Sequence, residues 1–400
     1  MTDTQQTKIQ VRNLSKVFGD DAKKALKLRD EGLNRAQILE KTGQTLGLSN
    51  INFDVREGEL LVIMGLSGSG KSTLIRCLNR LIEPTEGDII IGGENIPQLS
   101  DKALLHCRRR HFSMVFQNFA LFPHRTVQMN AEYGLEIRGI DKAERAEKAK
   151  SSLKQVGLEG WEHAYPNQLS GGMQQRVGLA RALANDSSVL LMDEAFSALD
   201  PLIRRDMQQE LIELQHRMKK TTIFITHDLD EALNIGDRII LLRDGEIVQI
   251  GTPEEVLTQP ADDYVARFTE GVDRSRVVTA RRVMRPVRAT ARHDDGPRTV
   301  LRKMSENALD SIYVVDRERR LLGIVEADGV DEAAKAGKDS IHELLITDFP
   351  RIGPDEPLAT LYPMFHGKSY PVAVIDDQQR LLGVVVKGAV LEQLAQTGEQ

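Results

Sequence analysis

The chain has 400 residues and a formal net charge of −6, from 53 Lys and Arg against 59 Asp and Glu. Hydrophobic residues make up 40% and charged residues 28%, which is typical of a globular protein and excludes a disordered chain, a collagen and a disulfide scaffold. The longest apolar run, Leu60–Leu66, is far shorter than the ~20 residues that span a bilayer. The mildly acidic charge argues against nucleic-acid binding, and two cysteines are typical of a reducing cytosol.

Residues 1–270 alternate apolar strand-like runs with amphipathic helical stretches, a pattern that predicts one domain with a parallel sheet flanked by helices. Buried strands are expected at Leu60–Met64, Val189–Met192, Thr222–Thr226 and Arg238–Leu242. Between two early strands, residues 19–48 have helical spacing with Gly32 between two halves, which predicts an inserted helical hairpin. Both a functional insertion and a plain surface feature are compatible with this pattern.

A glycine-rich stretch, GLSGSGKS, follows the first of these strands and precedes a predicted helix, which is the context of a phosphate-binding loop. Its glycines allow a tight turn in which several backbone N–H groups face one anion, and the following helix directs its positive end to the phosphates. We expect Lys71 to neutralise the β- and γ-phosphates and the Ser72 hydroxyl to ligate Mg²⁺. Cys77, among apolar neighbours on that helix, is expected to be a packing residue. The predicted nucleotide-binding residues here are Gly65, Leu66, Ser67, Gly68, Ser69, Gly70, Lys71, Ser72 and Thr73.

The second predicted strand ends in two adjacent carboxylates, Asp193 and Glu194. After a phosphate-binding loop, we expect Asp193 to hold the Mg²⁺ ion and Glu194 to polarise an attacking water as general base. A glycine pair in LSGGM begins another predicted helix, so that Ser170, Gly171 and Gly172 can present N–H groups to an anion. Because one chain needs only one cradle for its nucleotide, this second set predicts a site that serves the nucleotide of a second copy of the chain.

These motifs, in this order, resemble those of the ABC-transporter ATPases, with LSGGM in place of the usual signature LSGGQ. The resemblance spans about residues 8–265. It implies that Gln117 in MVFQ contacts the Mg²⁺ and water site, that Asp200 in SALD belongs to the D-loop, and that His227 in ITHD contacts the γ-phosphate. It also implies that Phe18 in KVFG stacks on the adenine ring. The implied cofactors are ATP and Mg²⁺; the implied catalytic residues are Glu194, His227 and Gln117, and the implied metal-site residues are Ser72, Gln117 and Asp193.

Residues 271–303 contain ten Lys and Arg against three Asp without clear periodicity, which predicts a basic linker and the start of a second region. The rest of the chain contains an internal repeat at an offset of 60 residues, in which Val314–Val325 matches Val374–Val385 at seven of twelve positions. Each copy has the pattern of a strand, a polar turn and a strand. The repeat resembles a tandem pair of CBS modules, with the remainder of the first at residues 304–338 and the second at residues 339–400.

The implied fold is therefore a P-loop NTPase ABC cassette of the α/β class, with a RecA-like core and a helical subdomain, followed by an α+β tandem CBS pair. Nucleotide-binding CBS modules commonly carry a Thr and an Asp three and six residues after the strand glycine. The corresponding residues here are Glu326 and Gly329 in the first copy and Val386 and Ala389 in the second. This departure favours a structural or charge-sensing role over adenosine binding.

The basic segment suggests a salt-sensitive contact with anionic lipid headgroups, because exposed charge pairs weaken as ionic strength rises. The alternative is a solvated face with ordinary intramolecular pairs to Asp294, Asp295 or other acids of the repeat. The arginines concerned are Arg281, Arg282, Arg285, Arg288 and Arg292.

The insertion, with ILEKTGQTLGL, and the CBS pair together resemble the ATPases of glycine betaine and proline importers, the quaternary-amine uptake family. The resemblance implies ATP hydrolysis that drives uptake of a compatible solute for osmoprotection, at the cytoplasmic face of the inner membrane. The implied partners are integral-membrane permease subunits, received by a groove along Asn118–Asn130, a second copy of the chain, and an external solute-binding protein acting indirectly. The apolar residues of Asn118–Asn130 are alternatively core of the helical subdomain.

Two other functions are compatible with the sequence. One is the ATPase subunit of another amino-acid or small-solute importer, because cargo selection lies in other subunits. The other is a CBS-regulated ATP-binding sensor without turnover. The presence of both Glu194 and His227 argues against the sensor.

Overall fold

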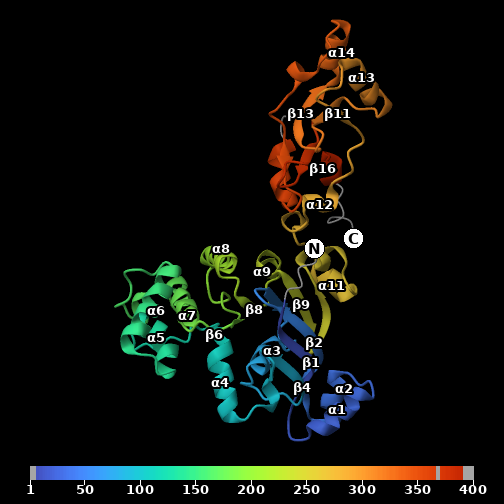
Figure 1. Ribbon diagram of the computed structural model, residues 1–400. Coiled ribbons are helices and arrows are strands. Elements are labelled where there is room, and N and C mark those ends of the chain that lie inside the picture. Colours follow the sequence, from blue (N-terminus) through green and yellow to red (C-terminus); the bar gives the residue numbers. More distant parts are fainter. Residues whose placement is uncertain (1–5, 366–369, 391–400) are drawn as a thin grey trace. The chain divides into compact units, whose positions relative to one another are not determined.

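The computed structural model describes residues 6–365 and 370–390, and the chain divides into two compact units, Met1–Thr269 and Glu270–Gln400 (Figure 1). Within its described residues, the first unit contains a six-stranded and a four-stranded sheet, and the second contains two three-stranded sheets. Each unit has its own hydrophobic cores, as expected for separate domains.

The six-stranded sheet of the first unit has the strand order β10-β9-β3-β8-β7-β6, and all its pairs are parallel except β10 with β9. Its strands are β3 (Leu60–Met64), β6 (Phe112–Phe116), β7 (Val189–Asp193), β8 (Thr221–Thr226), β9 (Arg238–Arg243) and β10 (Glu246–Gly251). Every residue of β3, β7 and β8 is buried, which explains their uninterrupted apolar or Thr-rich sequences. The four predicted buried strands are thus confirmed, three of them one residue longer than predicted.

Helix α3 (Lys71–Leu78) packs against both the four-stranded antiparallel sheet and the six-stranded sheet. The strands of the four-stranded sheet are β1 (Thr7–Phe18), β2 (Thr45–Arg56), β4 (Glu86–Ile91) and β5 (Glu94–Asn95). One core joins both sheets and the helix, since Ile9, Leu61 and Leu74 belong to the same buried cluster. Cys77 is fully buried in this cluster, and burial raises the pKa of its thiol to about 12, which confirms a packing role.

Helices α5, α6 and α7 pack on one another beside the sheets and form a helical subdomain (Figure 1). Before α5, the loop is fixed by the buried Asn130, whose amide donates to the carbonyls of Phe122 and Arg125 at 3.1 and 3.0 Å. Within Asn118–Asn130, Val127 is buried whereas Met129 is 45% exposed, so this segment contains both core and surface residues. The helices of this unit beyond α3 are α4 (Asp101–His111), α5 (Val127–Ile137), α6 (Lys142–Gln155), α7 (Gly171–Ala184), α8 (Pro201–Met218), α9 (Leu229–Ile235), α10 (Pro253–Thr258) and α11 (Asp263–Phe268).

The predicted helical hairpin is present between β1 and β2, as α1 (Ala22–Asp30) and α2 (Arg35–Thr42). Gly32 lies in the connection with a φ of +87°, a conformation that L side chains rarely adopt. Ile38 and Ala25 are fully buried in a small cluster with Val17 of β1 and Leu46 of β2. The hairpin is therefore packed onto the strands that it connects.

In the second unit, both copies of the repeat form the predicted strand, turn and strand. The turns have equivalent geometry, because Arg319 and Gln379, 60 residues apart, have φ values of +64° and +61°. The turns also bond to each other: Leu321 N–H donates to Gln379 O at 2.9 Å, and Leu381 N–H donates to Arg319 O at 3.0 Å. The elements are α12 (Ala280–Val283), β11 (Thr290–Arg292), α13 (Pro297–Glu306), β12 (Ser311–Val315), β13 (Leu321–Glu326), α14 (Ala327–Lys335), β14 (Arg351–Ile352), β15 (Val372–Ile375) and β16 (Leu381–Val385).

Residues 271–303, predicted to hold a basic linker and the start of the first CBS module, contain elements that are packed into the second unit. Ala280 and Val283 of α12 are buried in one cluster with Val374 and Val385 of the second copy. The backbone of Arg285 exchanges hydrogen bonds with that of Val384 at 2.8 and 3.0 Å. The segment thus begins in the core of the second copy, and its short elements are too brief to show a period in the sequence.

The hairpin packing predicts a stability effect that distinguishes two neighbouring residues. Ile38→Ala removes a fully buried side chain and should lower the free energy of unfolding by about 2–5 kcal/mol. Leu39→Ala, at a side chain that is 47% exposed, should change it by less than about 0.5 kcal/mol. Urea unfolding of the full chain followed by circular dichroism measures both midpoints; equal midpoints for the two variants would contradict the packing.

Candidate functional site

The glycine-rich loop between β3 and α3 adopts a backbone that requires its glycines. Gly65, Gly68 and Gly70 have φ values of +150°, +79° and +105°. A Cβ at Gly65 would lie 2.2 Å from the carbonyl oxygen of Leu242, and one at Gly70 would lie 2.8 Å from that of Gly47. The loop therefore folds back closely on its neighbours, and it leads into the N-terminus of α3 as a phosphate-binding loop does.

Lys71, the first residue of α3, turns its side chain back into the loop. Only 5% of the residue is exposed, and its ammonium donates to the carbonyls of Gly65 and Leu66 at 2.8 and 3.1 Å. Burial lowers the pKa of Lys71, while the nearby carboxylates of Glu194 and Asp193 raise it. The loop thus encloses a positive charge.

The end of β7 brings a carboxylate to the next residue of α3. The hydroxyl of Ser72 donates to Asp193 Oδ1 at 3.1 Å, and Arg76 lies 3.4 Å from Asp193 Oδ2. Asp193 is buried, at 6% exposure. A hydroxyl and a carboxylate oxygen at this separation are the hard oxygen donors that Mg²⁺ prefers.

Glu194 and His227 follow the ends of two adjacent parallel strands and meet. His227 Nδ1 lies 3.2 Å from Glu194 Oε2. Glu194 has a φ of +47°, and its N–H donates to Ile225 O of β8 at 3.1 Å, so its backbone is held in an unusual conformation at the strand end. The pair is placed by the β7–β8 register, which aligns the carboxyl ends of both strands.

One cavity of about 620 Å³ collects most of these groups. The aromatic ring of Phe18, at 40% exposure, lies at this cavity close to Gly47, where a Cβ would approach the ring within 2.7 Å. The residues that line it are Phe18, Arg35, Thr45, Gly47, Leu66, Ser67, Gly68, Gly70, Lys71, Ser72, Thr73, Glu194 and His227. The structure therefore brings the predicted adenine-stacking, phosphate-binding and catalytic side chains to one place.

Eight predicted site residues do not line this cavity. Gly65 and Ser69 belong to the phosphate-binding loop itself, and Asp193 accepts the hydrogen bond of Ser72, which does line the cavity. The other five belong to other segments. Gln117 is exposed after the end of β6. Ser170 and Asp200 cap the N-termini of α7 and α8 with their side chains, and both are exposed. Gly171 is exposed and Gly172 is buried in the first turn of α7. None of these five residues lines the cavity at the phosphate-binding loop of its own chain.

Three residues of the cavity were missed by the sequence analysis: Arg35, Thr45 and Gly47. Arg35 donates from Nη1 to the carbonyl of Gly68 at 2.8 Å. The signal that was available is a basic residue directly after Asn34, a helix-capping residue type, in an insertion that follows Phe18. Its proximity to the loop depends on hairpin packing, which the sequence pattern does not specify.

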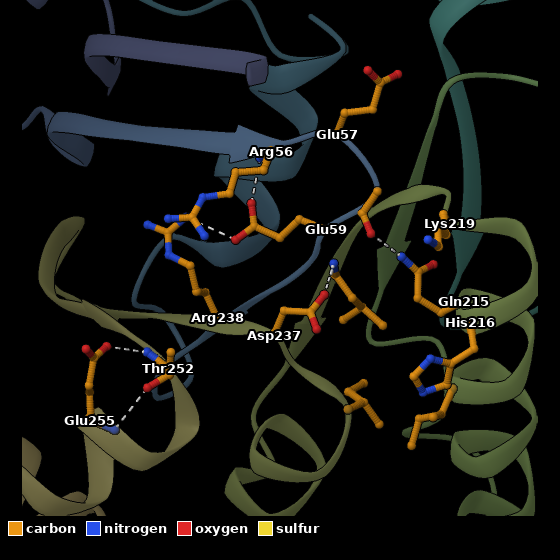
Figure 2. A pocket seen from close by; sticks show the side chains of 14 residues that line it. Arg56, Glu57, Glu59, Gln215, His216, Lys219, Asp237, Arg238, Thr252 and Glu255 are labelled. Carbon is orange, nitrogen blue, oxygen red and sulfur yellow. Dashed lines mark hydrogen bonds and ion pairs between the residues drawn. The ribbon is translucent and has the colours of Figure 1, made fainter. Parts of the chain in front are cut away.

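A second cavity of about 690 Å³ lies at the opposite, amino-terminal end of β3 and β9 (Figure 2). Its charged groups are bonded within the protein: Glu59 accepts from Arg238 at 3.0 Å, and Asp237 accepts from Leu60 N–H at 2.8 Å. Gln215 donates to the carbonyl of Gly58 at 2.8 Å. These contacts tie strands and helices together, and none of the predicted site residues lines this cavity.

Comparisons with known proteins agree with this geometry. Residues 48–197 match the ABC transporter family, and residues 280–334 and 341–396 match the CBS domain. The dimeric ATP-binding cassette MJ0796, in a post-hydrolysis state bound to ADP and Pi, superimposes with a TM-score of 0.52 and 34% identity. That match covers 61% of this chain and 98% of the other.

Curated relatives match along nearly the whole chain. The glycine betaine transport ATP-binding protein OpuAA of Bacillus subtilis is 53% identical over 99% of this chain and 94% of its own length. The glycine betaine/carnitine transport ATP-binding protein GbuA of Listeria monocytogenes is 53% identical over 97% and 98%. The glycine betaine/proline betaine transport system ATP-binding protein ProV of Escherichia coli is 46% identical over 98% of both.

The fold, the phosphate-binding loop and the strand-end residues define an ATP-binding subunit of an ABC transporter, joined to two CBS domains. Within that class, the chain belongs to the family of glycine betaine and proline betaine transport ATP-binding proteins. In the part of the chain that the structure describes, no helix is long and apolar enough to cross a membrane.

The contact between Gly47 and Phe18 predicts an effect on nucleotide affinity. Gly47→Ala should displace the ring and weaken ATP binding, and Phe18→Ala should weaken it by about 5- to 150-fold if the ring stacks on adenine. Gly178→Ala, in α7 with only an ordinary contact at 3.6 Å, is the matched control and should leave affinity unchanged. Titration with a fluorescent ATP analogue measures all three; unchanged affinity in Phe18→Ala would contradict stacking.

Proposed function

We propose that this chain is the ATP-hydrolysing subunit of an importer that takes up glycine betaine or proline betaine as compatible solutes for osmoprotection. The observation that carries the proposal is the convergence of Phe18, Lys71, Glu194 and His227 on one cavity. The relatives that match nearly the whole chain are transport ATP-binding proteins for these solutes, which supports the substrate class.

In this proposal, the nucleotide is held from the base to the phosphates by groups that line one cavity. The ring of Phe18, which is exposed to solvent in the free protein, stacks on the adenine ring. The ammonium of Lys71 exchanges its bonds to the Gly65 and Leu66 carbonyls for phosphate oxygens, and the N–H groups at the start of α3 face the same anion. The oxygens of Ser72 and Asp193 hold Mg²⁺, which neutralises charge on the phosphates when bound.

Glu194 and His227, which follow the ends of β7 and β8, carry out the chemical step. Glu194 accepts a proton from a water molecule as the water oxygen bonds to the γ-phosphorus. The bond between that phosphorus and the oxygen bridging it to the β-phosphate breaks, so that ADP and inorganic phosphate are the products. His227, 3.2 Å from the Glu194 carboxylate, orients that carboxylate and contacts the γ-phosphate. The held backbone of Glu194 fixes the direction from which the base approaches.

A second copy of the chain completes the site. Ser170, Gly171, Gly172 and Asp200 are separate from the cavity of their own chain, and the first three begin a helix whose N–H groups suit an anion. The similar cassette MJ0796 is dimeric with bound ADP and Pi. We therefore infer an ATP sandwich in which each loop is closed by α7 of its partner, with Gln117 reaching the site on closure.

The partners and place of action follow from the proposed role. Integral-membrane permease subunits dock at the segment Asn118–Asn130, whose loop is fixed by Asn130 and which exposes Met129. The subunit is peripheral at the cytoplasmic face of the inner membrane. An external solute-binding protein delivers cargo to the permease and does not contact this chain.

The proposed roles predict the behaviour of Glu194→Gln. Removing the base should lower ATP turnover by about 100-fold or more, while ATP binding persists and traps a dimer. Gel filtration with Mg-ATP and a phosphate-release assay measure both, with the exposed Glu246→Gln as the control that remains active and monomeric. If Glu194→Gln stays monomeric at every protein concentration, the proposed ATP-sandwich dimer is contradicted. A separate variant, Lys71→Ala, should lose nucleotide binding itself.

The basic segment supports a second part of the proposal, which concerns regulation. We propose that its arginines contact anionic lipid headgroups, and that salt releases this contact and permits ATP hydrolysis. The Debye length falls from ~10 Å at 0.1 M to ~3 Å at 1 M, so exposed contacts weaken over that range. Intramolecular pairing competes, since Arg281 makes two bonds to Asp355, at 2.9 and 3.1 Å.

This competition gives variants that shift the salt response in opposite directions. Replacing Arg281, Arg282, Arg285 and Arg288 by Gln should lower the salt concentration that activates the assembled transporter in liposomes with anionic lipid. Asp355→Asn releases Arg281 without removing positive charge and should raise that concentration. ATPase activity against salt is the measurement; a shift in the same direction for both variants would refute lipid contact and indicate a general loss of stability.

A further inference from the structure

The inserted hairpin begins and ends at the proposed nucleotide cavity. Phe18, the last residue of β1, and Thr45, the first residue of β2, are partners in the antiparallel register, and both line the cavity. The hairpin therefore leaves the sheet and returns to it beside the ring that is proposed to stack on adenine. Arg35, at the start of α2, lines the same cavity.

The position of Arg35 is fixed by local structure on both sides. Its predecessor, Asn34, caps α2 in a reciprocal arrangement with Gln37, with both hydrogen bonds at 3.0 Å. One turn further, Ile38 is fully buried against Val17 of β1. The first residue of α2 is thus held between a cap and a buried anchor, and its Cα cannot drift away from the cavity without breaking one of them.

The guanidinium of Arg35 reaches the phosphate-binding loop. Nη1 donates to the carbonyl of Gly68 at 2.8 Å. A Cβ at Gly68 would meet nothing within 4 Å, so the loop is not closely packed at the residue that Arg35 contacts. A guanidinium carries five N–H donors, and this bond uses one of them.

Two cationic side chains, Lys71 and Arg35, line the cavity, and they differ in their surroundings. The ammonium of Lys71 is enclosed in the loop, and the carboxylates of Asp193 and Glu194 lie close to it. Arg35 is half-buried at the rim of the cavity, and in the part of the chain that the structure describes it makes no ion pair with a carboxylate. A planar, permanently charged guanidinium is the side chain best suited to bind phosphate oxygens through two bonds.

We propose that Arg35 of the inserted hairpin binds the phosphate chain of the nucleotide in the cavity that it lines together with Lys71. This inference rests on the proposed ATP site and assigns a function to the insertion, namely that it adds a phosphate ligand to the site. The bond to the Gly68 carbonyl keeps the guanidinium beside the loop until the nucleotide arrives.

Nucleotide affinity of the full chain tests this role. Arg35→Gln should weaken binding of both ATP and ADP by about 10- to 100-fold, since it removes charged hydrogen bonds to phosphate. Arg35→Lys should recover part of the loss, because it keeps the charge and loses the paired geometry. Lys41→Gln removes one positive charge from the same helix at an exposed position and should bind as the unchanged protein does.

Two further measurements separate this role from others. The melting temperature of nucleotide-free Arg35→Gln should equal that of Lys41→Gln. If Arg35 only stabilised the loop, its replacement would lower the melting temperature of the nucleotide-free protein. Lys71→Ala tests the ATP site itself: if it binds ATP normally, the proposed function fails. If Lys71→Ala loses binding but Arg35→Gln matches Lys41→Gln, the ATP site stands and the role of Arg35 is refuted.

Discussion

The buried ammonium of Lys71 is the constraint on which the nucleotide site depends. The loop from Gly65 wraps around it, and two backbone carbonyls accept hydrogen bonds from it. Burial disfavours the charged form and lowers the pKa of Lys71, while Asp193 and Glu194 favour it from nearby. In the free protein, the carbonyl dipoles only partly balance the charge of the buried ammonium. A polyphosphate that enters the loop supplies a full opposite charge, so nucleotide binding offsets the cost of burying Lys71.

The parallel sheet converts distant sequence positions into one site. Residues after β3, β7 and β8 meet because the carboxyl ends of parallel strands lie at the same edge. Gly65, Asp193 and His227 are far apart in the chain, yet each directly ends or follows a buried strand. The general base lies among them because the positive φ of Glu194 turns the chain at the end of β7.

Because the site residues directly end or follow buried strands, much of the fold and of the site could be predicted from the sequence. Buried strands have distinctive apolar runs and their ends are marked by charged or glycine residues, so β3, β7 and the residues that follow them could be predicted. The repeat at offset 60 likewise predicted both CBS hairpins, because the same residues form the same turns. The helix α12 was not predicted as an element, since four residues show no period and its burial against Val374 is a long-range contact.

Arg35 shows a different limit of sequence interpretation. Its capping box with Asn34 is a local pattern, but its approach to Gly68 depends on Ile38 packing against Val17, which no spacing rule specifies. The sheet tolerates the hairpin because Phe18 and Thr45 are already neighbours in the register, so added residues between them leave every strand pair unchanged. Closing a longer loop between fixed ends costs little extra entropy, and the buried cluster of the hairpin offsets that cost. The turn between β1 and β2 is therefore a position where the chain can add a ligand to the nucleotide site without altering the strands that carry the catalytic residues.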